Sequence, residues 1–357
     1  MITLVKNRHD MELWERLLLE SIKSAEALSS DMNINTKNIR DVISKYPVFI
    51  NPYYLSLIKS KDDAIYRQAI PDTREITQQN GYVDPLNEED LSPVPGLTHK
   101  YPDRVLFLVS SRCAMYCRFC NRKRKVGTSS MVTRETIREG LSYIRKTKTV
   151  RDVLLSGGDP LLLSDRKIYS ILDQVRSIPH VDIIRIGTRV PCTLPQRITP
   201  RLADMLKGFH PLFINTHFNH PSEITPEAAS ACNLLTNAGI PLGCQTVLLK
   251  GVNNDSEIMK ELFRKLLTIR IRPYYLFQAD LVKGTSHFWT PLKEGIEIMA
   301  KLQGEVSGLS IPRFMIDLPD GGGKVPITPE YINGVDGNEL LIKNYLGKEY
   351  RYPVVEA

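Results

Sequence analysis

From residue 105 onward, short apolar runs alternate six times with longer amphipathic stretches. The runs have the length of buried strands, and the stretches carry apolar residues at helical spacing. The predicted strands cover residues 105–110, 153–156, 182–187, 212–217, 242–249 and 273–279. The predicted helices cover residues 133–147, 165–178, 198–208, 224–238, 254–269 and 291–306. Six strand–helix units in series predict a parallel sheet covered by helices.

The first predicted strand is not followed by the glycine fingerprint of a dinucleotide-binding sheet, so a curved sheet is favoured over an open doubly wound one. We therefore predict an α/β fold, a partial (β/α)6 barrel like a TIM barrel, preceded by an N-terminal helical region. Residues 8–46 have helical periodicity, and Pro47 ends the second predicted helix. The predicted divisions are 1–97 (helical cap and wrapped segment), 98–307 (barrel core) and 308–357 (C-terminal segment and tail).

Three of the six cysteines lie in a loop directly after the first predicted strand. Cys113, Cys117 and Cys120 have the spacing Cys-x3-Cys-x2-Cys. Three thiolates on one short loop suit a [4Fe–4S] cluster whose fourth iron is open to a small molecule. Zinc sites usually have two Cys-x2-Cys units, or one unit followed by a histidine pair, and neither pattern is present. A cluster is therefore favoured over zinc and over three unrelated thiols. The other cysteines are expected in the core: Cys192, Cys232 and Cys244.

Polar residues gather where the predicted strands end. In barrels of this kind the chemistry takes place at the C-terminal ends of the strands. Such positions hold residues 156–160 (Ser-Gly-Gly-Asp-Pro), Thr188 and Arg189, residues 215–220, Gln245 and Asp280. One polar strand end is usually structural, but a whole rim of them indicates a ligand site.

A lysine follows three consecutive glycines near the C-terminus. Glycines 321–323 give a backbone that can approach a ligand closely. A phosphate-binding loop would need Ser or Thr after Lys324, and Val325 stands there instead. A lysine presented in this way can form a Schiff base, which is the usual anchor of pyridoxal phosphate (PLP). The alternative is a surface turn with a solvated lysine.

The chain of 357 residues has a net charge of +7 and a basic run at residues 118–125 that overlaps the cysteine loop. Anion binding beside the cluster is the favoured interpretation of that run, against a solvated loop. No apolar stretch approaches the roughly 20 residues of a membrane span. Residues 1–10 lack the apolar centre of a signal peptide, so a cytoplasmic protein is expected.

Together these segments resemble the lysine 2,3-aminomutase family of radical S-adenosylmethionine (SAM) enzymes, from about residue 98 to residue 329. The motifs that carry the resemblance are residues 101–105, the cysteine loop, and residues 156–160, 215–221 and 317–326. The resemblance implies a radical SAM barrel and an isomerase that uses a [4Fe–4S] cluster, SAM and PLP.

The reaction that the resemblance implies is the conversion of L-lysine to β-lysine by amino migration. Alternatives are other cationic amino acids, namely arginine and ornithine, and the enzymes that isomerise a lysine later attached to elongation factor P. Two rivals rank lower: a radical SAM enzyme that modifies tRNA, and a non-enzymatic electron carrier.

The resemblance also implies roles for individual residues. The cluster ligands would be Cys113, Cys117 and Cys120. Lys324 would be the catalytic lysine that holds PLP. The other PLP contacts would be Lys100, Tyr101 and Arg104, with Lys100 standing where relatives carry arginine. The SAM contacts would be Gly157, Gly158, Asp159, His217 and Gln245. Arg122 would pair with the substrate carboxylate. Asp280 and Asp317 would bind a cationic substrate side chain, since an ammonium inside a barrel needs nearby anions.

The implied partners are a small amino-acid substrate and an electron donor such as flavodoxin or ferredoxin. Neither a membrane nor nucleic acid is expected. Relatives often carry C-terminal cysteines for structural zinc at a subunit interface, whereas the last cysteine here is Cys244. No structural zinc is therefore expected, and a homo-oligomer is left as an open possibility.

Overall fold

The structure is a computed structural model that describes residues 11–32, 36–78, 80–128 and 131–354. Its centre is a nine-stranded sheet in which the strands follow one another in chain order, β1 to β9. Seven of them are parallel: β2 (Arg104–Ser110), β3 (Asp152–Gly157), β4 (Ile183–Gly187), β5 (Leu212–His217), β6 (Leu242–Leu248), β7 (Ile271–Gln278) and β8 (Arg313–Leu318). The six predicted strands are confirmed, within one or two residues at each end.

The seventh parallel strand, β8, and the two edges of the sheet were not predicted. β1 (Leu97–Tyr101) pairs antiparallel with β2, and β9 (Gly323–Pro326) pairs antiparallel with β8. Among the described residues no ladder joins β1 to β9. A side chain bridges them instead, because the Lys324 amide donates to the Tyr101 hydroxyl at 3.0 Å. The barrel is therefore partial, as predicted, and its open seam lies between β1 and β9.

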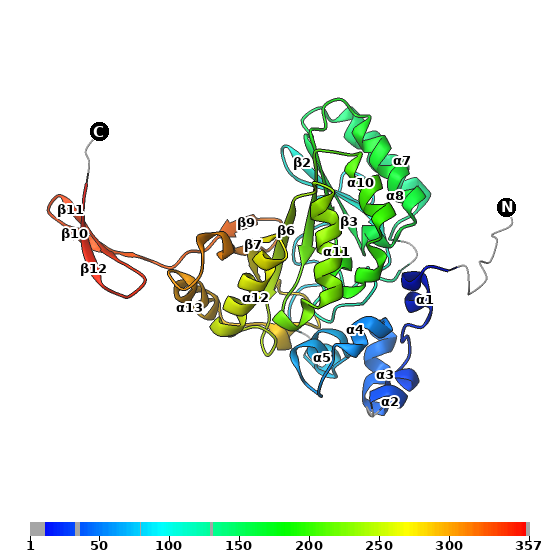
Figure 1. Cartoon of the computed structure of the whole chain (residues 1–357), viewed down its shortest axis with the longest axis horizontal. Coiled ribbons are helices and arrows are strands. Elements are labelled where there is room, and N and C mark those ends of the chain that lie inside the picture. The colour runs from blue at the N-terminus through cyan, green and yellow to red at the C-terminus, as the bar shows by residue number, and fades with distance from the viewer. Residues whose placement is uncertain (1–10, 33–35, 79, 129–130, 355–357) are drawn as a thin grey trace.

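Helices cover the outer face of the curved sheet (Figure 1). The six predicted helices are α7 (Arg134–Lys146), α8 (Asp165–Arg176), α10 (Pro200–Lys207), α11 (Pro226–Asn237), α12 (Ser256–Thr268) and α13 (Leu292–Leu302). Threonine hydroxyls cap three of them by accepting from backbone amides, at Thr133, Thr199 and Thr225. A short helix, α9 (Val190–Thr193), follows β4. The helices bury their apolar faces, such as Leu141 and Ile144 of α7, against the sheet in one continuous core.

The N-terminal region is a set of short helices beside one end of the barrel (Figure 1). They are α1 (Leu13–Leu19), α2 (Ala25–Met32), α3 (Thr36–Lys45), α4 (Pro52–Ser56), α5 (Ala64–Ala69) and α6 (Arg74–Thr77). The helix predicted to end before Pro47 is confirmed as α3. The first residues of the predicted helical region, 8–10, and the segment without a signal-peptide centre, 1–10, lie outside the described residues. None of the helices in the described ranges is long and apolar enough to cross a bilayer.

The C-terminal end forms a small antiparallel sheet of its own, which the sequence did not predict. Its strands are β10 (Ile332–Asp336), β11 (Glu339–Lys343) and β12 (Glu349–Pro353). It extends away from the barrel at the end of an extended segment (Figure 1). β8 and β9 belong to the main sheet, although both follow residue 307, where the predicted barrel core ends. The division of the chain at residues 97 and 307 stays a prediction.

Candidate active site

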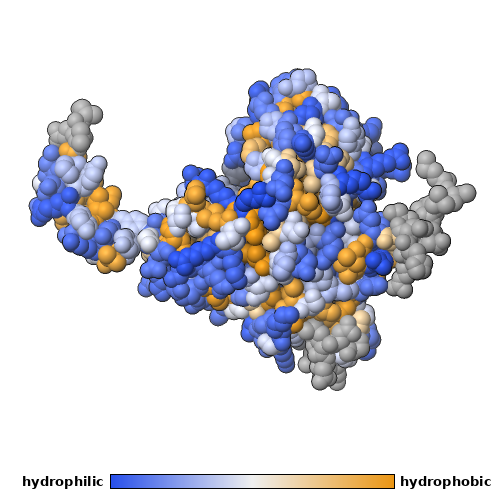
Figure 2. Space-filling view, in the orientation of Figure 1, coloured by the Kyte–Doolittle hydropathy of each residue, from blue (hydrophilic) through white to orange (hydrophobic). Residues whose placement is uncertain are grey.

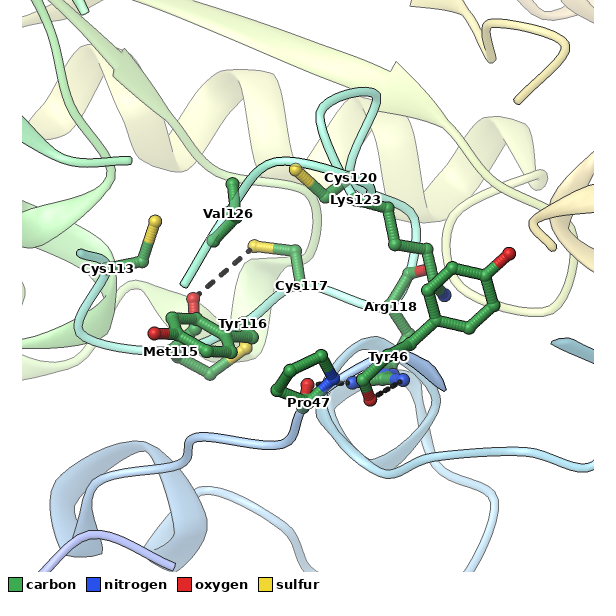
Figure 3. A pocket seen from close by; sticks show the side chains of 10 residues that line it. All are labelled: Tyr46, Pro47, Cys113, Met115, Tyr116, Cys117, Arg118, Cys120, Lys123 and Val126. Atoms are coloured by element: carbon green, nitrogen blue, oxygen red, sulfur yellow. Dashed lines mark hydrogen bonds between the residues drawn. The ribbon is translucent and has the colours of Figure 1, made fainter. Parts of the chain in front are cut away.

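The cysteine loop begins where β2 ends, at the rim formed by the C-terminal ends of the parallel strands. Its three thiols, Cys113, Cys117 and Cys120, line one recess that opens in part to solvent (Figure 3). The carbonyl groups of Phe49 and Gln68, from the N-terminal region, accept hydrogen bonds from the loop backbone at 2.9 Å each. The structure thus brings the three predicted cluster ligands to one recess.

The three thiols suit a positively charged group that is larger than a single metal ion. Burial raises the pKa of Cys113 well above its ordinary value and that of Cys120 to about 11, and the neighbouring cysteines add to both shifts. Buried thiols become thiolates together only if a cation shares their recess. In the described part of the chain, no three His, Cys, Asp or Glu side chains are placed to hold a single metal ion. An iron–sulfur cluster is a group that three spaced thiols fit.

The basic run beside the thiols meets the protein's own carboxylates. Arg118 and Lys123 are buried, and both contact Glu75 of α6, at 2.6 Å each. Further along, Arg124 pairs with Asp84 and Glu89, and Lys125 pairs with Glu89. Carboxylates from residues 75–89 therefore pair with most of the run, which leaves the predicted anion binding beside the cluster to Arg122. We call residues 75–89 the acidic segment.

Arg122, the predicted partner of the substrate carboxylate, also meets the acidic segment. Its Nε and Nη2 atoms donate to the two carboxylate oxygens of Glu88 at 3.1 and 2.6 Å. This contact uses one edge of the planar guanidinium fork. Nη1 makes no hydrogen bond within the described ranges, so Nη1 and the second N–H of Nη2 form a further edge that can donate to a second carboxylate.

The Gly157–Asp159 turn after β3 packs directly on the cysteine loop. Gly158 N donates to the Ser110 carbonyl and Asp159 N to the Arg112 carbonyl, at 2.6 Å each. A Cβ atom on Gly157 would lie 2.2 Å from Ser110 O, and one on Gly158 would lie 2.4 Å from Arg112 O. Only glycine allows this approach at both positions.

The Asp159 carboxylate is saturated by the protein. It accepts from Leu161 N at 3.0 Å and from Thr188 Oγ1 and Arg189 N at 2.7 Å each. Burial nevertheless raises its pKa to about 6. Asp159 therefore holds the turn in shape, and its contact with SAM stays a prediction.

The other predicted SAM contacts, His217 and Gln245, are neighbours in the register of β5 and β6. His217 packs against Phe119 of the cysteine loop, with ring centroids 5.6 Å apart. Burial lowers the pKa of His217 to about 3, and the positive charge of Arg189 contributes, so its ring is neutral. Gln245 accepts from the Tyr274 hydroxyl at 3.1 Å.

Lys324 lies on β9 opposite Asp317 of β8, at the seam of the barrel. Its Nζ contacts one oxygen of the Asp317 carboxylate, and Lys100 Nζ lies 3.1 Å from the other. Arg104 stacks on the Tyr101 ring, 4.0 Å from its centroid, and the Tyr101 hydroxyl holds the Lys324 amide. The structure thus brings together all four predicted PLP contacts, and it places Asp317 among them.

Asp280 follows β7 and faces the same region. It accepts from the Asn121 amide at 3.1 Å. Burial raises the pKa of Asp280 to about 6, and the charge of Asp317 adds to the shift, while Lys324 and Arg122 oppose it. The charges of Asp317, Lys324 and Arg122 therefore all act on the Asp280 carboxylate. The two carboxylates are in this way connected to the lysine and to the basic run.

Comparison with known proteins gives two matches to family models. Residues 107–263 match the radical SAM superfamily, and residues 299–356 match lysine-2,3-aminomutase. The L-lysine 2,3-aminomutase of Fusobacterium nucleatum subsp. nucleatum is 48% identical over 94% of this chain and 80% of that protein. The chain belongs to the lysine 2,3-aminomutase family. The L-lysine 2,3-aminomutase of Clostridium subterminale is 47% identical over 95% and 83% of the two chains. The glutamate 2,3-aminomutase of Clostridioides difficile is 44% identical over 93% and 80%.

Membership of the lysine 2,3-aminomutase family confirms the predicted family, the radical SAM barrel and the class of enzyme, an isomerase. It also brings three cofactors: a [4Fe–4S] cluster, SAM and PLP. The residues present fit this set. Three thiols share a recess beside the glycine turn, and a lysine stands among cationic and aromatic side chains at the seam.

One buried network was missed by the sequence analysis of this family member. Arg189, directly after β4, donates from Nη1 to Cys117 Sγ at 2.8 Å and from Nη2 to Glu223 Oε1 at 2.7 Å. Gln68 of α5 accepts from the same Nη2 atom at 2.6 Å. The sequence marks Arg189 only as a polar strand end and gives no signal for Glu223. Arg189 and Glu223 are 34 residues apart and match no local motif, so only the fold reveals the pair.

Proposed function

We propose that this isomerase converts L-lysine to β-lysine by moving the amino group from the α-carbon to the β-carbon. The observation that carries the proposal is the pair of carboxylates, Asp280 and Asp317, coupled to each other and to Lys324 at the barrel seam. Two anions in a buried site favour a substrate with a cationic side chain and disfavour glutamate.

The cluster and SAM supply a carbon-centred radical that removes a hydrogen atom from the substrate, and PLP carries the amino group as it migrates. The chain's own residues bind and orient. Lys324 would hold PLP through its side-chain nitrogen. Asp317, with Asp280, is placed to pair with the distal ammonium of the substrate. The free edge of Arg122 receives the substrate carboxylate.

The first alternative within the family is another cationic substrate, arginine or ornithine. The second is the type of enzyme that isomerises a lysine later attached to elongation factor P. The rival function of tRNA modification has less support, because the acidic segment neutralises the basic run that suggested it. An electron donor such as flavodoxin or ferredoxin is proposed as the reductant. We place the enzyme in the cytoplasm, where thiols stay reduced.

We also propose a homo-oligomer that uses the small C-terminal sheet. Cross-strand pairs form two adjacent apolar rows on one face of this sheet. One row is Ile332, Ile342 and Tyr350, and the other is Val335, Leu340 and Tyr352. Four of the six are largely exposed, and hydrophobic residues are visible there in Figure 2. An exposed apolar face of this kind suits a second copy of the chain. Sedimentation velocity of the wild type and of I342K tests it, and a monomeric wild type would contradict it.

The test of the reaction is anaerobic incubation of the reconstituted protein with SAM, PLP and a panel of lysine, ornithine, arginine and glutamate. Products are separated by chromatography and identified by mass. Lysine should be consumed fastest, and β-lysine should be its product. Turnover of glutamate without turnover of lysine would overturn the roles of Asp280 and Asp317.

A further inference from the structure

The guanidinium of Arg189 lies between a cluster cysteine and a buried carboxylate. Its Nη1 is 2.8 Å from Cys117 Sγ, and its Nη2 is 2.7 Å from Glu223 Oε1. Arg189 is 8% exposed and Glu223 is fully buried. If the pair served only to neutralise charge, no N–H would need to face a thiol. The arrangement is therefore an ordered line of thiol, cation and anion.

The anion end of this line is fixed in place. Glu223 Oε2 accepts from the backbone amides of Asn219 and His220 at 2.6 and 3.0 Å. Its Oε1 accepts from the Tyr54 hydroxyl at 2.7 Å. Gln68 Oε1 accepts from Arg189 Nη2 at 2.6 Å. With these contacts the carboxylate cannot move toward the thiol, and the guanidinium keeps its positive edge on Cys117.

A positive group at a cluster sulfur changes how readily the cluster accepts an electron. Hydrogen bonds to the sulfurs and the net local charge are among the factors that set the potential of an iron–sulfur cluster. A guanidinium is always protonated, so its charge does not vary with pH. Reduction adds one electron from a low-potential one-electron donor and exchanges no atoms. The added negative charge is stabilised by the nearby cation, and Glu223 offsets part of this effect.

We propose that Arg189 is a positioning residue that raises the reduction potential of the cluster held by the cysteine loop, and that Glu223 limits the rise. The proposal rests on the proposed function only in requiring that a cluster binds there. It predicts shifts of opposite sign for the two residues. Removing the cation makes the potential more negative, and removing the anion makes it more positive.

The experiment is an anaerobic potentiometric titration of the reconstituted enzyme with dithionite as reductant, followed by the electron paramagnetic resonance signal of the reduced cluster. We expect R189Q to shift the midpoint to more negative values. R189K keeps the positive charge but lacks the planar guanidinium, so its midpoint potential should lie between those of R189Q and the wild type. E223Q should shift the midpoint to more positive values. A purely structural role would reduce the amount of cluster in all three variants without this reversal of sign.

The matched control is R197Q. Arg197 is also fully buried and paired, with Asp165, and it contacts no thiol within the described ranges. Its loss should leave the midpoint unchanged. Unchanged midpoints in R189Q and E223Q at full iron and sulfide content, or shifts of the same sign, would overturn the proposal. If R189Q fails to retain a cluster, R189K and E223Q decide in the same way. Absence of cluster absorbance in the wild type would instead refute the proposed function.

Discussion

The cysteine loop and the Lys324 site both lie at strand ends, yet they handle charge in opposite ways. At the cysteine loop, the cations of the basic run are balanced by carboxylates from the acidic segment. At the Lys324 site two lysines share Asp317, while Asp280 makes no ion pair within the described part of the chain. The cations of the first region therefore have partners within the chain. In the second region Asp280 has no cationic partner of its own among the described residues, so a cationic ligand can pair with it, and specificity is expected there.

The largest effect on turnover is expected for the K324A variant, which removes the lysine of the second region. We expect turnover to fall on the order of 10⁴-fold or more, because the residue that holds PLP acts as one unit with it. The visible absorbance of lysine-bound PLP should disappear. The control is K343A, on β11 of the small sheet. If the absorbance survived in K324A, the assignment of this lysine would be wrong.

The next largest effect is expected at the cysteine loop, for the E75Q variant. This change leaves Arg118 and Lys123 buried with a neutral partner, and breaking a buried ion pair costs about 3–5 kcal/mol. The measurement is the free energy of unfolding of the cluster-free protein in urea. E135Q, which breaks an exposed pair with Arg138, is the control. A loss below about 1 kcal/mol, as for a surface pair, would mean that the acidic segment does not hold the loop.

A smaller effect is expected for D280N, in binding. Loss of one charged hydrogen bond should raise the KM for lysine about 10–100-fold. Burial raises the pKa of Asp280 to about 6, so its anion forms only as the pH rises through that value. The KM of the wild type should therefore increase as the pH falls below about 6. D280N should lack this pH dependence, whereas D90N, at an exposed position, should keep it. The same dependence in D280N would exclude Asp280 as its source.

The smallest effect is expected for E89Q. Glu89 is 64% exposed, and its partners Arg124 and Lys125 lie at the surface side of the basic run. Pairs of this kind contribute less than about 1 kcal/mol. The measurement is the free energy of unfolding in urea, as for E75Q, repeated with added salt. An effect as large as that of E75Q would show that the acidic segment acts as a single unit.

The strands β2 to β7 and the grouping of the three thiols could be predicted, because each has a local signal in periodicity or spacing. The seventh parallel strand β8, the antiparallel edges β1 and β9 and the small sheet were missed, since short strands carry too little apolar periodicity. Partners of charged residues were the least predictable. Arg118 finds Glu75 and Arg189 finds Glu223 across 43 and 34 residues, and only the fold determines which carboxylate is in reach.

The acidic segment has a consequence for the life of the enzyme in the cell. Carboxylates and backbone carbonyls of the chain itself hold the cysteine loop, so the loop has supporting contacts that do not involve iron. We expect maturation to proceed in two stages, with folding first and delivery of iron and sulfide to the recess afterwards. On this expectation, a molecule that loses its cluster to oxygen stays folded and can take up a new one.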